Sequence, residues 1–129
     1  MEEIDMKGKR FYLKTHEWVE FIDEKTARIG ISDFAQQELG DIVFVNLPEV
    51  GDDVVAGEGF AEVESVKSIS EVYSPVTGVV KSVNEKLQDN PELVNEDAYD
   101  AWFVEVGDIS AKEELLTEEE YNEFLESEN

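Results

Sequence analysis

Few side chains in this sequence have the types and spacing that enzymes use for chemistry. There is no cysteine, which removes disulfides, thiolate nucleophiles and cysteine-based zinc sites. His16 is the only histidine, so a histidine metal site or a Ser-His-Asp triad would depend on one residue, and no Gly-x-Ser-x-Gly motif accompanies it. Gly57-Glu58-Gly59 begins like a nucleotide loop, but Glu62 replaces the third glycine and no helical pattern follows. We expect no catalytic centre, no metal site and a structural role for His16.

Lys67 lies between two segments rich in β-forming residues, 60–66 and 68–73. Alternation along these segments predicts one apolar and one acidic face. The apolar face holds Ala61, Val63 and Val72, and the acidic face holds Glu62, Glu64 and Glu71. No Asn-Gly or Gly-Gly pair marks a tight turn at Lys67, so the local sequence does not by itself establish a hairpin there.

The remaining sequence predicts mainly short strands. Ser32 is expected to cap a helix over 33–39, and Gly40 to supply the left-handed position that ends it. Asn90-Pro91 can open a further helical turn. The expected strands are 12–21 and 26–31, which flank the turn Asp23-Glu24-Lys25, and then 41–47, 79–83 and 101–106.

The C-terminal segment has a helical pattern. Ser110 with Glu113 forms a capping box, and apolar residues recur at helical spacing as far as Leu125. We therefore expect an amphipathic helix over 110–126, packed on the sheet. It belongs to a single domain over 11–129, preceded by an N-terminal extension over 1–10.

Charge and hydropathy exclude several classes of partner. The 129 residues contain 33 acidic and 10 basic side chains, for a net charge of −23, so nucleic acid and anionic lipid surfaces would be repelled. The apolar runs are far shorter than the ~18 residues of a membrane span. The acidic N-terminus does not look like a secretory signal or a mitochondrial presequence. We expect a cytoplasmic protein that binds neither nucleic acid nor membrane.

The stretch Glu64-Ser65-Val66-Lys67, followed by Ser74-Pro75-Val76-Thr77-Gly78, resembles the lipoyl attachment region of lipoyl domains and H proteins. The resemblance implies that Lys67 stands at the exposed tip of a hairpin and carries covalently attached lipoic acid, as N6-lipoyllysine. Biotin carriers have Met-Lys-Met at this point. Val66-Lys67-Ser68 therefore favours lipoic acid.

Further motifs are similar to those of the H proteins of the glycine cleavage system. They are Thr15-His16-Glu17-Trp18-Val19, Gly30-Ile31-Ser32, Gly40 through Pro48, and Pro91-Glu92-Leu93-Val94-Asn95. The resemblance covers roughly residues 11–125. It implies a mostly β, lipoyl-domain-like fold, the beta-barrel-sandwich hybrid, with two β-units, short helices and a C-terminal α-helix.

The family resemblance also implies a carrier function without catalysis. A pyridoxal-phosphate glycine decarboxylase (P protein) loads an aminomethyl group onto the lipoyl sulfur. An aminomethyltransferase (T protein) passes the one-carbon unit to tetrahydrofolate, and dihydrolipoamide dehydrogenase (L protein) reoxidises the dithiol. A lipoyl ligase or lipoyl transferase attaches the cofactor. Because the reactive sulfurs belong to the cofactor, the protein supplies no nucleophile.

In the family, the loaded arm folds into a cleft on the carrier. The matching positions here are Thr15, Glu17 and Glu71, where a carboxylate would hold the terminal ammonium and shelter it from water. Glu71 departs from the aspartate that is usual in the family. Two alternatives stay open: an H-like protein that relays lipoate to other enzymes, and a binding scaffold that is not lipoylated.

Overall fold

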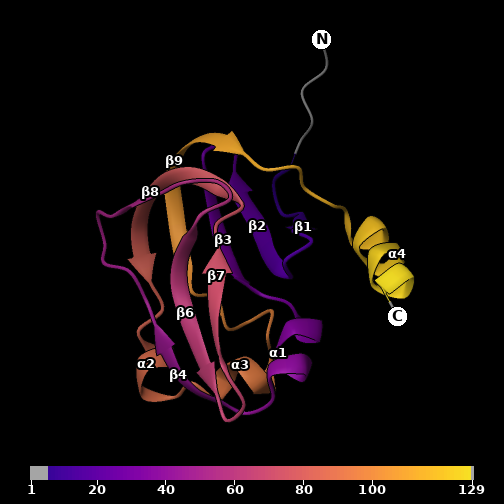
Figure 1. Ribbon diagram of the computed structural model, residues 1–129. Helices are drawn as coiled ribbons and strands as arrows, with labels where there is room; N and C mark the ends of the chain where they lie inside the picture. The colour runs from indigo at the N-terminus through magenta and orange to yellow at the C-terminus, as the bar shows by residue number, and fades with distance from the viewer. Residues whose placement is uncertain (1–5, 129) are drawn as a thin grey trace.

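A computed structural model describes residues 6–128 of the chain. The described residues form nine strands and four helices, labelled in Figure 1. In chain order they are β1 (Arg10–Tyr12), β2 (Glu17–Asp23), β3 (Thr26–Ile31), α1 (Asp33–Leu39), β4 (Ile42–Asn46), β5 (Asp53–Val54), β6 (Gly59–Ser65), β7 (Ile69–Tyr73), β8 (Val76–Val83), α2 (Lys86–Asp89), α3 (Leu93–Glu96), β9 (Val104–Lys112) and α4 (Glu118–Glu128). None of these helices, which all lie within residues 6–128, is both long and apolar enough to cross a membrane.

The strands form two antiparallel sheets that enclose one apolar core. The larger sheet has the order β1-β2-β3-β9-β8-β5, and the smaller has the order β4-β6-β7. Side chains from both sheets meet between them, among them Val19, Ile29, Val45, Val63 and Val72. Each sheet thereby buries one face in this core. The expected mostly β fold with two β-units, short helices and a C-terminal helix is confirmed.

The predicted hairpin faces and the first helix are confirmed. In β6 and β7 Ala61, Val63 and Val72 face the core, while Glu62, Glu64 and Glu71 are exposed. Ser32 caps α1 by accepting the N–H of Ala35 at 3.1 Å. Gly40 ends α1 with a φ of 82°, a conformation that a side chain would strain.

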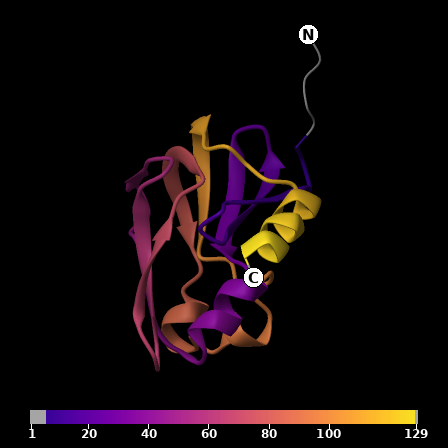
Figure 2. The same cartoon turned by 45° about the vertical axis from the view of Figure 1, so that its right-hand side comes forward.

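A second apolar cluster holds the C-terminal helix against the larger sheet. Tyr12, Trp18, Leu116 and Tyr121 are buried together. The rings of Tyr12 and Tyr121 stack with their centroids 4.4 Å apart. Figure 2 shows α4 beside β1, with its C-terminal end close to α1. Residues from α4 therefore lie near the N-terminal end of α1.

Two of the expected boundaries are wrong. The helix predicted over 110–126 begins at Glu118, because 110–112 continue β9 and pair with β8. The true capping box is Thr117 with Glu120, each accepting the other's backbone N–H, at 2.9 and 3.1 Å. The expected extension over 1–10 is also too long: Met6 packs on the core and Arg10 begins β1, while residues 1–5 lie outside the described residues.

Candidate functional site

The hairpin of β6 and β7 ends in a tight turn at Lys67. The N–H of Ser65 donates to the carbonyl of Ser68 at 2.8 Å, so Val66 and Lys67 are the two central residues. The buried Ser65 hydroxyl accepts the N–H groups of Lys67 (3.1 Å) and Ser68 (3.2 Å). None of these four residues has a positive φ, so the turn needs no glycine or asparagine. The Lys67 side chain is exposed at the tip.

Asn95 of α3 holds the loop on which this tip rests. Its Oδ1 accepts the N–H of Ile42 at 2.8 Å, and its Nδ2 donates to the carbonyl of Gly40 at 2.9 Å. The same loop binds the tip directly, because the N–H of Val66 donates to the carbonyl of Asp41 at 3.0 Å. Hydrogen bonds thus join α3, the end of α1, the start of β4 and the lysine turn.

The Lys67 side chain lies against Gly40. A β-carbon at position 40 would lie 3.4 Å from Cε and 3.9 Å from Nζ of Lys67. Gly40 combines a φ of 82° with a ψ of −158°, a region essentially confined to glycine. Position 40 therefore ends α1, turns the chain into β4, and leaves room for the lysine at the C-terminal end of α1.

A cavity of about 470 Å³ lies between α1, β7 and residues 15–17. Its lining includes all three residues predicted for the arm cleft. They are joined there by residues from α1, β7 and the C-terminal end of α4; the full lining is Thr15, His16, Glu17, Ile31, Phe34, Ala35, Glu38, Leu39, Val63, Ser70, Glu71, Val72 and Glu128. Lys67 does not line this cavity, but its side chain contacts Gly40, which follows the lining residue Leu39 in the chain. An arm attached to Lys67 can run along α1, whose seven residues span about 10 Å.

Glu17 is the buried carboxyl of this cavity, with 2 % of its surface exposed. Its Oε1 accepts the Thr15 hydroxyl at 2.5 Å, and its Oε2 accepts the N–H of Tyr73 at 2.8 Å. Burial raises the pKa of Glu17 to about 7, although the hydrogen bonds from Thr15 and Tyr73 act in the opposite direction. Near neutral pH, a cation entering the cavity would therefore favour ionisation of this group.

Glu71 lines the cavity from the edge strand β7, but its carboxylate lies on the outer face of the smaller sheet. It pairs with the exposed Glu62, and a β-carbon on Gly59 would collide with its carboxylate. The β7 side chains on the inner face are the buried Val72 and its polar neighbour in that row, Ser70, which pairs with the buried Val63. The sequence analysis did not name Ser70 as a cleft residue. Because neighbouring residues of a strand face opposite sides, the outward position predicted for Glu71 already implied that Ser70 faces inward.

His16 and Tyr121 connect the cavity to the C-terminal helix. The Tyr121 hydroxyl lies 2.8 Å from Nδ1 of His16 and 2.7 Å from Oγ of Ser32, the cap of α1. Burial lowers the pKa of His16 and raises the pKa of Tyr121 to about 12. His16 itself has a φ of 81°, an uncommon value for a residue with a side chain. Its structural role was predicted, whereas Tyr121 was missed because the partner is 105 residues away in the sequence.

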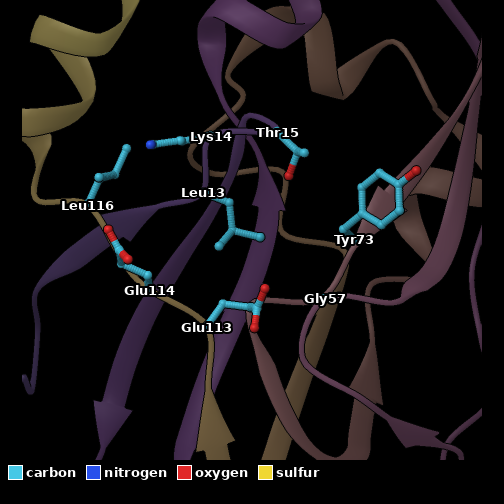
Figure 3. A pocket seen from close by; sticks show the side chains of 8 residues that line it. All are labelled: Leu13, Lys14, Thr15, Gly57, Tyr73, Glu113, Glu114 and Leu116. Carbon is cyan, nitrogen blue, oxygen red and sulfur yellow. The ribbon is translucent and has the colours of Figure 1, made fainter.

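A second cavity, of about 320 Å³, lies on the other side of Thr15 (Figure 3). Thr15 and Tyr73 line it on one side, and Glu114 and Leu116 on the other. Lys67 lines neither cavity, and Leu39, the neighbour of Gly40, lines only the first. Because Thr15 lines both cavities, its hydroxyl lies in the wall that separates them.

Comparisons with known proteins agree on one family. The family model described as Glycine cleavage H-protein matches residues 10–128. The chain is 59% identical over 117 residues to the glycine cleavage system H protein of Lachnoclostridium phytofermentans, covering 91% of this chain and 92% of that protein. It is 49% identical over 128 residues to the probable glycine cleavage system H protein of Pyrococcus abyssi, covering 97% and 96%.

A solved structure shows the same fold. The chain resembles the crystal structure of a glycine cleavage system H protein from Mycobacterium marinum with a TM-score of 0.83 and 40% sequence identity. The match covers 90% of this chain and 95% of the other. Sequence and structure therefore point to the same relatives over nearly the whole chain.

Proposed function

The chain belongs to the glycine cleavage H-protein family, and on this premise we propose that Lys67 carries the lipoyl group and that the adjoining cavity holds the loaded arm. Proteins of this family are non-catalytic carriers with covalently attached lipoic acid. The chain is accordingly the lipoyl carrier of the glycine cleavage system, with the P, T and L proteins as partners. A cytoplasmic location belongs to the same proposal, and cell fractionation tests it.

The observation that carries the proposal is the contact of the Lys67 side chain with Gly40, whose neighbour Leu39 lines the cavity. The Lys67 amine is exposed at the end of a turn that the Ser65 hydroxyl and the Asp41 carbonyl hold in place. An attaching enzyme needs such an amine on a rigid protrusion. The side chain then runs over Gly40, so an arm extended from Nζ starts beside the cavity lining.

The cavity suits the lipoyl arm chemically. Leu39, Ala35 and Phe34 offer α1 side chains along the path of a hydrocarbon chain. At the far end lie Thr15 and Glu17, whose carboxylate can accept a hydrogen bond from an ammonium. When bound, the lipoyl group supplies the sulfur that takes up the aminomethyl unit; the chain's own residues position that unit and exclude water from it.

Glu17 has the larger part in holding the amine. It lies inside the cavity and its pKa of about 7 lets it ionise when a cation approaches. Glu71 reaches the same amine only after its side chain turns over the edge of β7, because its carboxylate lies over Gly59.

Intact mass spectrometry after co-expression with a lipoyl ligase tests the proposal. The parent should gain one lipoyl group, and Lys67→Arg should gain none, because arginine keeps the charge but cannot form the amide. Lys25→Arg is the matched control, since Lys25 lies in the turn of the β2–β3 hairpin. Lipoyl addition to the Lys67→Arg variant would contradict the proposal, and a parent that gains no group at all would instead favour the non-lipoylated scaffold.

A further inference from the structure

Large apolar side chains are exposed around Lys67. Four of the seven exposed large apolar residues in the described part of the chain lie at this end of the smaller sheet. We call these four the tip platform: Val43 (49 % exposed), Phe44 (50 %), Val66 (66 %) and Ile69 (65 %). Soluble proteins seldom expose apolar side chains in a group unless another molecule covers them.

The strand register places two members of the tip platform in one row. Phe44 of β4 pairs with Glu64 of β6, and Glu64 pairs with Ile69 of β7. Residues directly opposite one another in antiparallel strands share a face, so Phe44 and Ile69 flank Glu64 on the outer face of the sheet. Val66 and Ile69 also lie immediately around Lys67 in the sequence.

The next row of the same face is polar and acidic. It consists of Asn46, Glu62 and Glu71, in register across the three strands. A partner that covers the tip platform therefore meets apolar side chains beside the lysine and carboxylates farther along the sheet. The complementary surface is apolar at its centre with lysine or arginine at its edge.

One class of partner must approach the lysine that these residues surround. Attachment joins Nζ of Lys67 to the carbonyl carbon of an activated lipoyl group, here the acyl adenylate formed from lipoate and ATP. The amide C–N bond forms, the bond from the carbonyl carbon to the phosphate oxygen breaks, AMP leaves, and the nitrogen loses a proton. Before this step there is no arm, so the attaching enzyme has to bring its active site onto Nζ itself. Enzymes that act on the finished arm meet its far end.

We propose that the tip platform is the docking surface for the enzyme that attaches lipoate to Lys67. The inference rests on the proposed function, in which Lys67 is the attachment site. Phe44 and Ile69 provide the apolar contact, and Glu64 between them favours a basic group opposite it. Glu62 and Glu71 in the next row favour a basic edge on the enzyme. We expect such contacts to affect binding of the carrier to the enzyme, and to leave the rate of amide formation in the complex nearly unchanged.

The test measures kcat/KM for lipoylation of the apo-protein by a purified lipoate–protein ligase supplied with lipoate and ATP. Phe44→Ser and Ile69→Ser should each lower kcat/KM about tenfold or more, chiefly through KM. Val50→Ser is the matched control, because Val50 is 62 % exposed and lies outside the tip platform; its kcat/KM should stay within about twofold of the parent value. If Ile69→Ser melts at a lower temperature than the parent, Ile69→Thr replaces it in the assay, because threonine keeps the β-branched shape.

The results for the docking surface can be told apart from those for the attachment site. A parent that is lipoylated at Lys67, together with platform variants lipoylated at the parent rate, overturns the docking surface and leaves the attachment site intact. Platform variants lipoylated to completion are then assayed for glycine–carbon dioxide exchange with the decarboxylase. If these variants support exchange close to the parent level, the result supports the tip platform as a docking surface for the attaching enzyme. If their exchange rate falls as much as their kcat/KM for lipoylation, the assignment to the attaching enzyme is overturned.

Discussion

The carboxylate of Glu17 in β2 accepts the backbone N–H of Tyr73 in β7, with 2.8 Å between Oε2 and the nitrogen. β2 belongs to the larger sheet and β7 to the smaller one. A single buried side chain thus links the two sheets beside the cavity. Because Glu17 also lines the cavity, it joins a structural position to the binding role proposed for it.

The first prediction concerns stability and pH. The pKa of Glu17 rises from an ordinary value of 4.5 to about 7 in the folded chain. Between these values the unfolded chain has released the proton and the folded chain keeps it, so the contribution of Glu17 to the free energy of unfolding falls as pH rises, by up to about 3 kcal/mol. Glu17→Gln should remove this fall. Urea unfolding at pH 4.5 and pH 8 should show the variant gaining stability relative to the parent at the higher pH. Glu38→Gln, an exposed carboxyl of the same cavity, is the control and should show no such gain.

The second prediction concerns retention of the loaded arm. Replacing Glu17 with Gln removes a charge-assisted contact typically worth about 1.5–3 kcal/mol. At pH 8, where Glu17 is ionised, the loaded Glu17→Gln variant should release formaldehyde and ammonia about tenfold faster than the parent when no transferase is present. Glu71→Gln should change the rate less, because its carboxylate lies over Gly59. Equal decay of the parent and the Glu17→Gln variant would exclude Glu17 as the group that holds the amine.

The third prediction concerns Gly40. Gly40→Ala should destabilise the fold by about 1–3 kcal/mol, because its backbone conformation is essentially restricted to glycine. It should also slow lipoylation, since the loop that ends in Gly40 supports the turn and contacts Lys67. Gly51→Ala is the control: Gly51 also has a positive φ, of 99°, but no atom lies within 4 Å of its added β-carbon. If both variants are lipoylated equally fast, Gly40 has no part in presenting the lysine.

The fourth prediction separates two capping-box patterns. Thr117→Ala should lower stability by about 1 kcal/mol and weaken hydrogen-exchange protection in α4, because Thr117 caps that helix. Ser110→Ala should leave α4 unchanged, because Ser110 lies in β9. Loss of protection in α4 on replacing Ser110, with none on replacing Thr117, would restore the boundary that the sequence pattern suggested.

Local signals in the sequence were sufficient for the elements nearest to Lys67. The alternation of Val63 and Glu64 predicted the two faces of the hairpin, and Ser32 with Gly40 predicted both ends of α1. These features depend on neighbouring residues, so a sequence pattern contains them. The family motifs predicted Lys67 and the cleft residues Thr15, Glu17 and Glu71. The last three line one cavity, and the Lys67 side chain contacts Gly40, next to the lining residue Leu39.

Features set by distant contacts were not predictable in the same way. Ser110 and Glu113 match the capping-box pattern, but Ser110 lies in β9, which pairs with β8, so no helix begins there. The turn at Lys67 carries no glycine signal, because the Ser65 hydroxyl satisfies the backbone instead. The family motif placed Glu71 in the cleft, whereas the alternation along residues 68–73 had already placed its side chain on the outer face, where the structure has it.

Asn95 holds the loop beneath the lysine turn from a part of the chain that is synthesised later. Its side chain binds Gly40 and Ile42, which precede it by 55 and 53 residues. A nascent chain that ends before position 95 has made the hairpin segments but lacks the clamp on the loop beneath them. We therefore expect attachment of the cofactor to follow emergence of most of the domain from the ribosome, so that unfinished chains are left unmodified.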